Sequence, residues 1–365
     1  MGADSGVRAL GQAERGIPTE TPWWNSERHT DRRGFLMARR AIMRAIRRWF
    51  EDQDFTEVEA GILQVSPGNE AHLHAFATQM VTTDGTPSPL FLHTSPEFAC
   101  KKLLAAGETR IFDFARVFRN RERGALHAPE FTMLEWYRAG ADYHAVISDT
   151  VDLIRLAAQV SGLGGLSWRG GHVAAECTME RITVAQAFTR WAEIDVLATL
   201  SPDAPADRDG LAFQARALGI RVVDDDSWSD IFSRILVEKV EPELGRDNIT
   251  VLDEYPAVEA ALARRCRHDG RVAERFEVYV CGVELANGFG ELTDAVEQRA
   301  RFEAEMAEKQ RVYGERYPLD EDFLAALTYM PPASGVALGF DRLVMLATGA
   351  QRIDQVIWTP LPSGK

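Results

Sequence analysis

Two apolar segments joined by a charged loop constrain the fold of this 365-residue chain more than any other feature. Residues 111–119 and 131–138 read as strands, and the loop between them holds three consecutive charged side chains, a glycine and a proline. This pattern predicts a long antiparallel hairpin with a charged tip. Because side chains alternate across a strand, Phe131, Glu135 and Tyr137 should share one face. We therefore expect an aromatic ring, a carboxylate and a phenol on one surface of a sheet.

The remaining periodicity favours an α+β fold in which helices flank an antiparallel sheet. We expect helices over residues 32–50, 96–106, 143–160 and 294–313, strands over 55–63, 90–94, 248–252 and 275–292, and a strand-to-helix unit over 335–348. The domain organisation expected is a flexible arm over 1–30, a catalytic domain over 31–350 with an insertion at about 162–248, and a tail over 351–365.

Composition excludes several classes of protein. The net charge of −14 opposes broad binding to nucleic acid, because such binding depends on lysine and arginine displacing counterions. The four cysteines form no CxxC pair and no secretion signal is visible, so a reduced, cytoplasmic protein is expected. No apolar run reaches the roughly 18 residues of a membrane span, so no membrane association is expected.

The predicted helix over residues 32–50 is unusually basic. It contains seven arginines and no acid, with apolar residues at helical spacing between them. Two interpretations remain open at this stage. The arginines could form a solvated helix face, or they could form a docking surface for an anionic partner.

Two further groups of residues have the chemistry of a phosphate site. Glu277 and Glu284 could meet at a divalent cation across a turn, and paired carboxylates suit Mg²⁺ on a polyphosphate. Asn287 and Glu291 share a face of the strand that follows this turn. Arg342 stands where the final helix begins, and its guanidinium could clamp a phosphate tail bidentately.

The segments that carry these residues resemble motifs 2 and 3 of class II aminoacyl-tRNA synthetases. The sequence around Glu97, Glu135 and Asn287 is similar to that of lysyl-tRNA synthetase. Closer still is the resemblance to the synthetase paralogues that attach lysine, preferably the β-isomer, to a lysine of elongation factor P. It is carried by TSPEF, FRN, HAPEFTMLEWY, RVAERFEVY, GVELANGFGELTDA and SGVALGFDRLVMLA. It covers most of residues 35–160 and 248–350. The resemblance implies a class II synthetase fold, ATP as co-substrate, Mg²⁺, a homodimer and elongation factor P as the acceptor.

The same resemblance implies a role for each site residue. Arg119 would hold the α-phosphate and Arg342 the γ-phosphate, so both would stabilise charge that builds during adenylate formation. The other residues implied at ATP are Glu122, His127, Phe131 under the adenine, and Glu284. The residues implied around the amino acid are Glu97, Glu135, Tyr137, Ala286, Asn287 and Glu291. Glu277 and Glu284 would bind Mg²⁺.

A protein acceptor is expected for two reasons. Lysyl-tRNA synthetases place an oligonucleotide-binding barrel ahead of the catalytic core, whereas the core here begins near residue 35, and the chain is acidic. Stable tRNA binding is therefore not expected. Ala286 stands where the synthetases usually have glycine, and its methyl group is expected to crowd the α-carbon region of a substrate while tolerating the displaced amine of β-lysine.

The sequence departs from the class II pattern at two positions that bear on function. Gly61 stands where motif 1 usually has a proline of the dimer interface, and Arg121 stands where motif 2 usually has a glutamate. Two other functions stay open: a free-standing fragment that makes lysyl-adenylate for tRNA or a small amine, and a catalytically silent paralogue that senses lysine or ATP.

Overall fold

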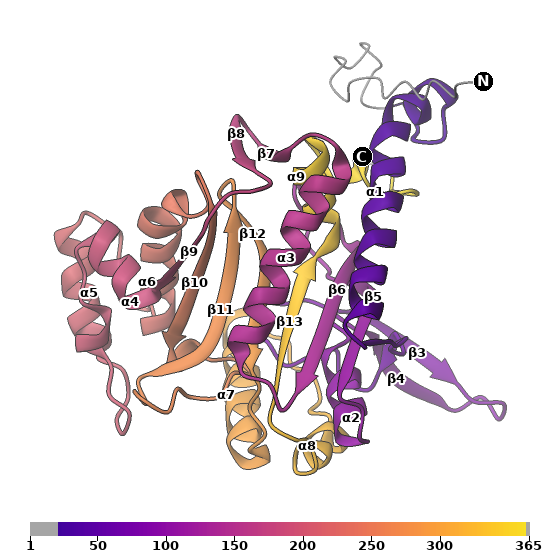
Figure 1. The fold of residues 1–365 in the computed structure, drawn as a ribbon. Coiled ribbons are helices and arrows are strands. Elements are labelled where there is room, and N and C mark those ends of the chain that lie inside the picture. The colour runs from indigo at the N-terminus through magenta and orange to yellow at the C-terminus, as the bar shows by residue number, and fades with distance from the viewer. Residues whose placement is uncertain (1–20, 363–365) are drawn as a thin grey trace, which may run out of the picture.

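An eight-stranded sheet forms the centre of the computed structural model, which describes residues 21–362 (Figure 1). Six strands pair antiparallel in the order β5 (Arg110–Phe118), β6 (Glu130–Ala139), β13 (Ala333–Gly339), β12 (Val283–Gly290), β11 (Val272–Val280) and β10 (Ile249–Pro256). Two short strands extend the edges in parallel, β1 (Thr56–Glu57) beside β5 and β9 (Met179–Thr183) beside β10. The expected α+β architecture is confirmed, although the two parallel edge pairs were not predicted.

Three helices cover one face of this sheet: α1 (Ser26–Asp52), α3 (Tyr143–Ser161) and α9 (Phe340–Thr348). The main apolar core lies between them and the sheet, and it includes Ile46 of α1 and Trp136 of β6, both fully buried. Removal of this apolar surface from water is the dominant favourable term for such a layer. No helix within residues 21–362 combines the length and the apolar content needed to cross a bilayer.

The seven arginines of residues 32–50, which all lie on α1, divide into two groups. Arg32 and Arg39 are buried against the protein, and Arg47 pairs with Glu57 at 2.9 Å. The four that stay exposed are Arg33, Arg40, Arg44 and Arg48. Part of the basic character of α1 is therefore structural, and only the exposed group leaves the two interpretations open.

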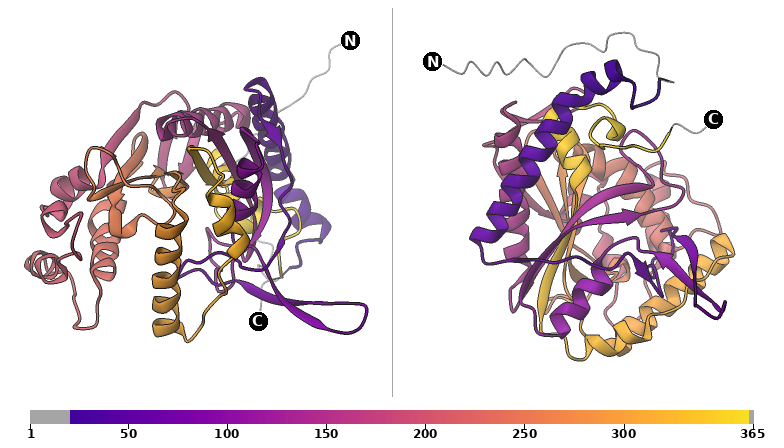
Figure 2. Two further views of the ribbon diagram at one scale, coloured as in Figure 1. Left: turned by 90° about the horizontal axis from the view of Figure 1, so that it is seen from below. Right: turned by 90° about the vertical axis from the view of Figure 1, so that its right-hand side faces the viewer.

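The opposite face of the sheet is covered in two regions, and the first lies at one end of β5, β6 and β13. There α2 (Glu97–Ala105), α7 (Ala295–Tyr313) and α8 (Glu321–Leu327) share a second apolar core, in which Phe98 and Phe323 stack with ring centroids 4.0 Å apart. These helices lie below the sheet in Figure 1. A small sheet of β2 (Leu63–Gln64), β4 (Pro87–Leu92) and β3 (Phe76–Val81) projects from this end (Figure 2). The single strand predicted over residues 55–63 is wrong. Only residues 56–57 and 63–64 form strands, and they pair with β5 and with β4 respectively.

The region predicted as an insertion is smaller than expected. It begins with a hairpin of β7 (Gly165–Trp168) and β8 (Gly171–Ala174), but β9 then joins the central sheet. The remaining part is helical, with α4 (Val184–Ala187), α5 (Arg208–Ala217) and α6 (Trp228–Ile235) around an apolar core that it shares with β9, β10 and β11 of the central sheet. The insertion proper therefore starts after β9, because residues 179–183 pair with β10.

The two terminal predictions also need correction. Residues 1–20 of the expected arm lie outside the described residues, but α1 already begins at Ser26, capped by the Asn25 side chain. The tail expected over residues 351–365 packs against the main core up to Ile357, because Ile353, Val356 and Ile357 are buried there. The packed part of the chain therefore extends at both ends beyond residues 31–350.

Candidate active site

The hairpin of β5 and β6 presents the predicted alternation of side chains. Leu134 and Trp136 point into the core under the helices, whereas Phe131 packs with a cluster on the other face. Glu135 and Tyr137 share that other face and contact each other, since the Tyr137 hydroxyl donates to Glu135. The prediction of a ring, a carboxylate and a phenol on one surface is confirmed.

Arg119 lies just beyond the end of β5 at the base of the charged loop. Its guanidinium sits 5.5 Å from the centre of the Phe131 ring, and its Nε donates to the Thr94 carbonyl at 3.2 Å. Cation–π contact and hydrogen bonding both restrict the rotamers of an arginine. A positive charge is thus held beside an aromatic ring. Such a pair could bind a nucleotide, with the arginine at a phosphate and the ring against the base.

Arg342 lies in the first turn of α9 and reaches over the end of the sheet. It donates from Nη1 to the Glu284 carbonyl at 3.0 Å, and its Nη2 lies 2.7 Å from Nε2 of His127. Burial and the positive charge of Arg342 lower the pKa of His127, so the imidazole is neutral and accepts this hydrogen bond. His127 and Arg342 therefore form one polar unit at the cleft.

A cleft of about 320 Å³ joins these groups. Eight of the predicted site residues line it, namely Arg119, Glu122, His127, Phe131, Glu284, Ala286, Asn287 and Arg342. Two guanidinium groups and an aromatic ring in one cleft match the charge and the base of a nucleoside triphosphate. The cleft therefore has the chemistry of an ATP site.

A cluster of buried acids lies next to this cleft. Glu97, Glu135 and Glu291 approach one another around Tyr137, and Ser95 donates to Glu135 at 2.7 Å. Sequence reasoning missed a lysine here.

That lysine is Lys101 of α2, which lies 2.6 Å from both Glu97 and Glu291 and is almost fully buried. Three carboxylates and one ammonium group leave two negative charges when all are ionised. Lysine and β-lysine each carry two ammonium groups, so the cluster matches either substrate in charge.

The close approach of these side chains depends on Gly335 of β13. A Cβ at this position would lie 2.3 Å from the Tyr137 ring and 2.6 Å from a carboxylate oxygen of Glu291. No side-chain atom can occupy that space without displacing one of them. The glycine in SGVALG is therefore part of the acidic pocket, although nothing in its local sequence marks it as a site residue.

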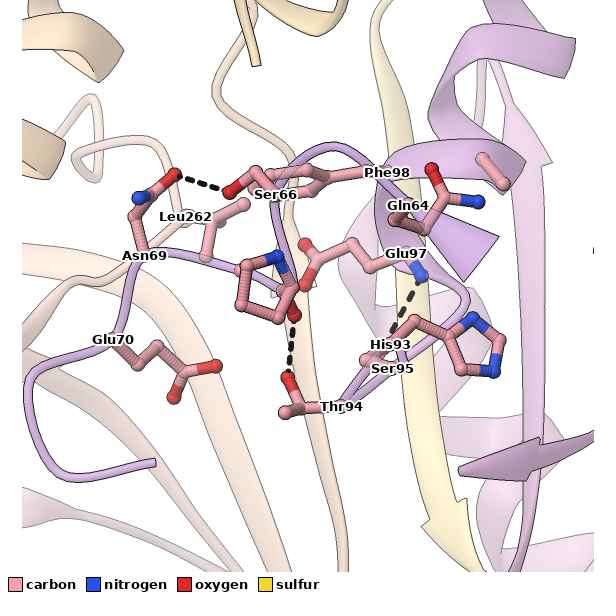
Figure 3. Close-up of a pocket in the computed structure, with 13 residues that line it drawn as sticks. Gln64, Ser66, Asn69, Glu70, His93, Thr94, Ser95, Glu97, Phe98 and Leu262 are labelled. Atoms are coloured by element: carbon pink, nitrogen blue, oxygen red, sulfur yellow. Dashed lines mark hydrogen bonds between the residues drawn. The ribbon is translucent and has the colours of Figure 1, made fainter. Parts of the chain in front are cut away.

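Figure 3 shows the wall of the site made by residues 64–70 and 93–99. These residues enclose a further cavity of about 20 Å³, which has room for a single water molecule. The carboxylates of Glu70 and Glu97 both point into the space between the two segments (Figure 3). Glu70 lines this cavity and also the larger cleft, so the two spaces are neighbours.

The two predicted metal ligands differ in their surroundings. Glu277 is buried, accepts hydrogen bonds from Tyr279 at 2.6 Å and from Arg275 at 2.7 Å, and does not line the cleft. Glu284 does line the cleft, where partial desolvation and the negative charge of Glu277 raise its pKa to about 7. No group of three potential ligands occurs within residues 21–362, but Mg²⁺ on a nucleotide needs only one or two carboxylates beside the phosphates. The pair is compatible with such an ion.

The expectation for Ala286 is wrong in its direction. Ala286 borders the cleft, but its side chain is buried in the core under the helices. The methyl group that faces the site belongs to Ala337 of β13, which pairs with Asn287 and Glu135 and packs with Phe131. Ala337, and not Ala286, therefore presents its methyl group to the cleft.

Arg121, the departure in motif 2, has a structural role. Its backbone is left-handed with φ of 66°, and its guanidinium pairs with Glu315 beyond the end of α7. His74 pairs with the same carboxylate at 3.0 Å. Arg121 therefore turns away from the cleft and ties the loop to α7, while Glu122 next to it lines the cleft.

The acidic pocket predicts a proton-linked affinity for lysine. Burial and the charge of Glu97 raise the pKa of Glu135 to about 8, while burial raises that of Glu291 to about 7 against the opposing effect of Lys101. A dication binds the ionised carboxylates, so binding below these values must release protons. We expect the Kd for lysine to fall by about tenfold per pH unit as pH rises toward 8, for each proton released. Calorimetry in buffers of different ionisation enthalpy measures this release, and proton uptake would contradict it.

Comparison with known proteins agrees with this geometry. Residues 19–362 match the family model described as tRNA synthetases class II (D, K and N). The chain is 40% identical over 330 residues to an elongation factor P–(R)-β-lysine ligase of Proteus mirabilis, covering 89% of this chain and 94% of that protein. A protein of the same name from Klebsiella pneumoniae is 40% identical over 326 residues, 88% of this chain and 93% of that protein.

The antiparallel sheet, the cleft that holds two arginines and the match over residues 19–362 identify a class II synthetase catalytic domain. The chain belongs to the class II (D, K and N) tRNA synthetase family, within the group of elongation factor P–(R)-β-lysine ligases. The family resemblance read from the sequence is thereby confirmed.

Proposed function

We propose that this protein activates a lysine, preferably (R)-β-lysine, with ATP and transfers it to the ε-amino group of a lysine on elongation factor P. The observation that carries the proposal is the acidic pocket with two negative charges beside a cleft that holds Arg119 and Arg342. The names of the relatives supply the acceptor and the isomer.

The chemistry needs no protein nucleophile for the first step. The substrate carboxylate attacks the α-phosphorus, pyrophosphate leaves, and the acceptor amine then attacks the mixed anhydride. Arg119 would hold the α-phosphate and Arg342 the terminal phosphate, with Phe131 against the adenine. Catalysis would then rest on alignment of the reactants and on stabilisation of the charge on the phosphate oxygens.

Mg²⁺ would be held by Glu284, with Glu277 behind it, and would neutralise charge on the triphosphate. Glu277 is itself fixed by Arg275 and Tyr279, which keeps its carboxylate in one orientation. We place the protein in the cytoplasm with its acceptor, and the net charge of −14 argues against stable binding of tRNA.

Pyrophosphate exchange tests the first half of the reaction. We expect ATP–pyrophosphate exchange that depends on lysine or β-lysine. No exchange is expected with amino acids that have neutral side chains, such as leucine and methionine. Exchange with neutral amino acids at equal rate would contradict the role of the acidic pocket.

The methyl group of Ala337 is expected to affect the discrimination between α-lysine and β-lysine. We expect Ala337→Gly to open space beside Asn287 and to improve use of α-lysine relative to β-lysine by about tenfold, since one methyl group in a pocket is worth about 1–3 kcal/mol. Ala286→Gly is the matched control, because its methyl group faces the core. The ratio of kcat/KM values in pyrophosphate exchange measures the effect, and an equal change in both variants would contradict the assignment.

We also propose that the protein is a homodimer. The small sheet and the residue after β2 expose four apolar side chains, Leu63, Val65, Met80 and Val81, each at least 49% accessible. An exposed apolar group of this kind marks an interaction surface, and a second copy could cover it symmetrically. Light scattering should give the mass of two chains, and Leu63→Glu should reduce it to one. A monomeric wild-type protein would refute the dimer.

A further inference from the structure

An amine acceptor poses a chemical problem that a hydroxyl acceptor does not. A lysine side chain has a pKa of about 10.4 and therefore arrives as an ammonium ion with no lone pair. It must lose a proton close to the adenylate before it can attack. A group that accepts this proton has to lie where the amino-acid pocket meets the nucleotide cleft.

Glu70 lies at this junction. It is the one residue within 21–362 that lines both the small cavity beside Glu97 and the cleft that holds Arg119. Its carboxylate points into the space between the two wall segments (Figure 3). An adenylate with its ammonium groups in the acidic pocket and its phosphate at Arg119 would place its carbonyl carbon between them, next to the wall that carries Glu70.

The backbone on both sides of Glu70 is fixed, while its side chain is not. Asn69 donates to the Pro318 carbonyl at 3.2 Å, and the Ala71 amide donates to Glu305 at 2.9 Å. Lys309 adds a hydrogen bond to the Ala71 carbonyl at 2.9 Å. Within the described residues the carboxylate of Glu70 has no hydrogen bond or ion pair. A rigid segment thus presents an uncommitted carboxylate to the site.

Electrostatics keep this carboxylate basic. Although its side chain is open to the cleft, the walls on either side desolvate it and raise its pKa. The charges that face it are Arg119 and Arg275, which lower its pKa, and Glu97 and Glu305, which raise it. The substrate's own ammonium groups do not require Glu70, because Glu97, Glu135, Glu291 and Lys101 already balance them.

We propose that Glu70 binds the ammonium group of the acceptor lysine and acts as the general base of the transfer step, an inference that rests on the proposed function. The carboxylate takes one proton from the ammonium ion, and the freed lone pair forms the C–N bond to the adenylate carbonyl carbon. The C–O bond to phosphate breaks, and AMP leaves with the electron pair. The nitrogen then loses its second proton to water, and Glu70 returns its proton to solvent.

The test separates the two half-reactions in Glu70→Gln. We expect lysine-dependent pyrophosphate exchange within twofold of wild type, but single-turnover transfer from the preformed adenylate to elongation factor P slowed by about 10²–10³-fold at neutral pH. The defect should shrink as pH rises toward the pKa of the amine. Reaction of the same adenylate with hydroxylamine, which is uncharged at neutral pH, should be unchanged. Glu70→Asp should recover part of the rate, and Glu108→Gln, an exposed glutamate after α2, serves as the control.

Three results would overturn the proposal. An unchanged rate of transfer in Glu70→Gln would show that Glu70 is not the general base. An equal loss in exchange and in transfer would show that Glu70 binds the amino acid or ATP instead. An equal loss with hydroxylamine would indicate a misplaced adenylate. Failure of the proposed function is distinguishable from all of these, because wild type itself would then form the adenylate without modifying elongation factor P.

Discussion

Arg119→Ala is expected to slow adenylate formation by about 10²–10³-fold, the usual effect of removing one preorganised donor from developing negative charge. The side chain lies beside Phe131 and donates a hydrogen bond to the Thr94 carbonyl. It is therefore already oriented before the reaction begins. The loss should fall mainly on kcat, because the interaction strengthens in the transition state. Pyrophosphate exchange at saturating ATP and lysine measures it.

Two variants sharpen this result. Arg119→Lys keeps the charge but loses the planar guanidinium, and we expect an intermediate rate. Arg110→Ala is the matched control, because Arg110 lies at the other end of β5 and its side chain donates to the Gln53 carbonyl on the surface. If Arg119→Ala kept more than about a tenth of the wild-type rate, the phosphate role of Arg119 would be wrong.

Arg39→Met is expected to have the largest effect on stability. Arg39 and Asp341 are both buried and form an ion pair, and Arg39 also donates to the Thr132 hydroxyl at 2.8 Å. Removal of one partner leaves a buried charge without compensation, which typically costs about 3–5 kcal/mol of unfolding free energy. The pair also connects α1 to α9, directly next to Arg342, so the KM for ATP should rise in the same variant.

Arg40→Met is the control for this prediction. Arg40 is adjacent on α1 but exposed, and we expect its unfolding free energy to stay within about 0.5 kcal/mol of wild type. Chemical denaturation followed by circular dichroism gives both values. Equal destabilisation by the two substitutions would show that the loss comes from the helix and not from the buried pair.

The sequence predicted those features that depend on local pattern. The alternation along residues 131–137 has a period of two, so it placed Glu135 and Tyr137 on the site face correctly. The same alternation could have corrected Ala286, since a strand that directs Asn287 and Glu291 to the site must direct Ala286 to the core.

Features that depend on distant partners could not be predicted in this way. Lys101 reads as an ordinary charge on α2, and its role follows only from its contact with Glu291, which lies 190 residues further along the chain. The edge strand β9 has no strong strand pattern and is extended because β10 pairs with it. Glu70 gains its significance from the cavities on its two sides, which no sequence window contains.

The intact mass of elongation factor P after incubation with this protein, ATP, Mg²⁺ and β-lysine or lysine tests the central claim most directly. We expect a gain of one lysyl unit with the wild-type protein, no gain with Arg342→Ala, and no labelling of bulk tRNA in a parallel reaction. Label on tRNA with an unchanged mass of the factor would contradict the account and indicate a free-standing synthetase. If neither acceptor were labelled and no lysine-dependent pyrophosphate exchange occurred, a regulatory protein that only binds lysine or ATP would replace the ligase.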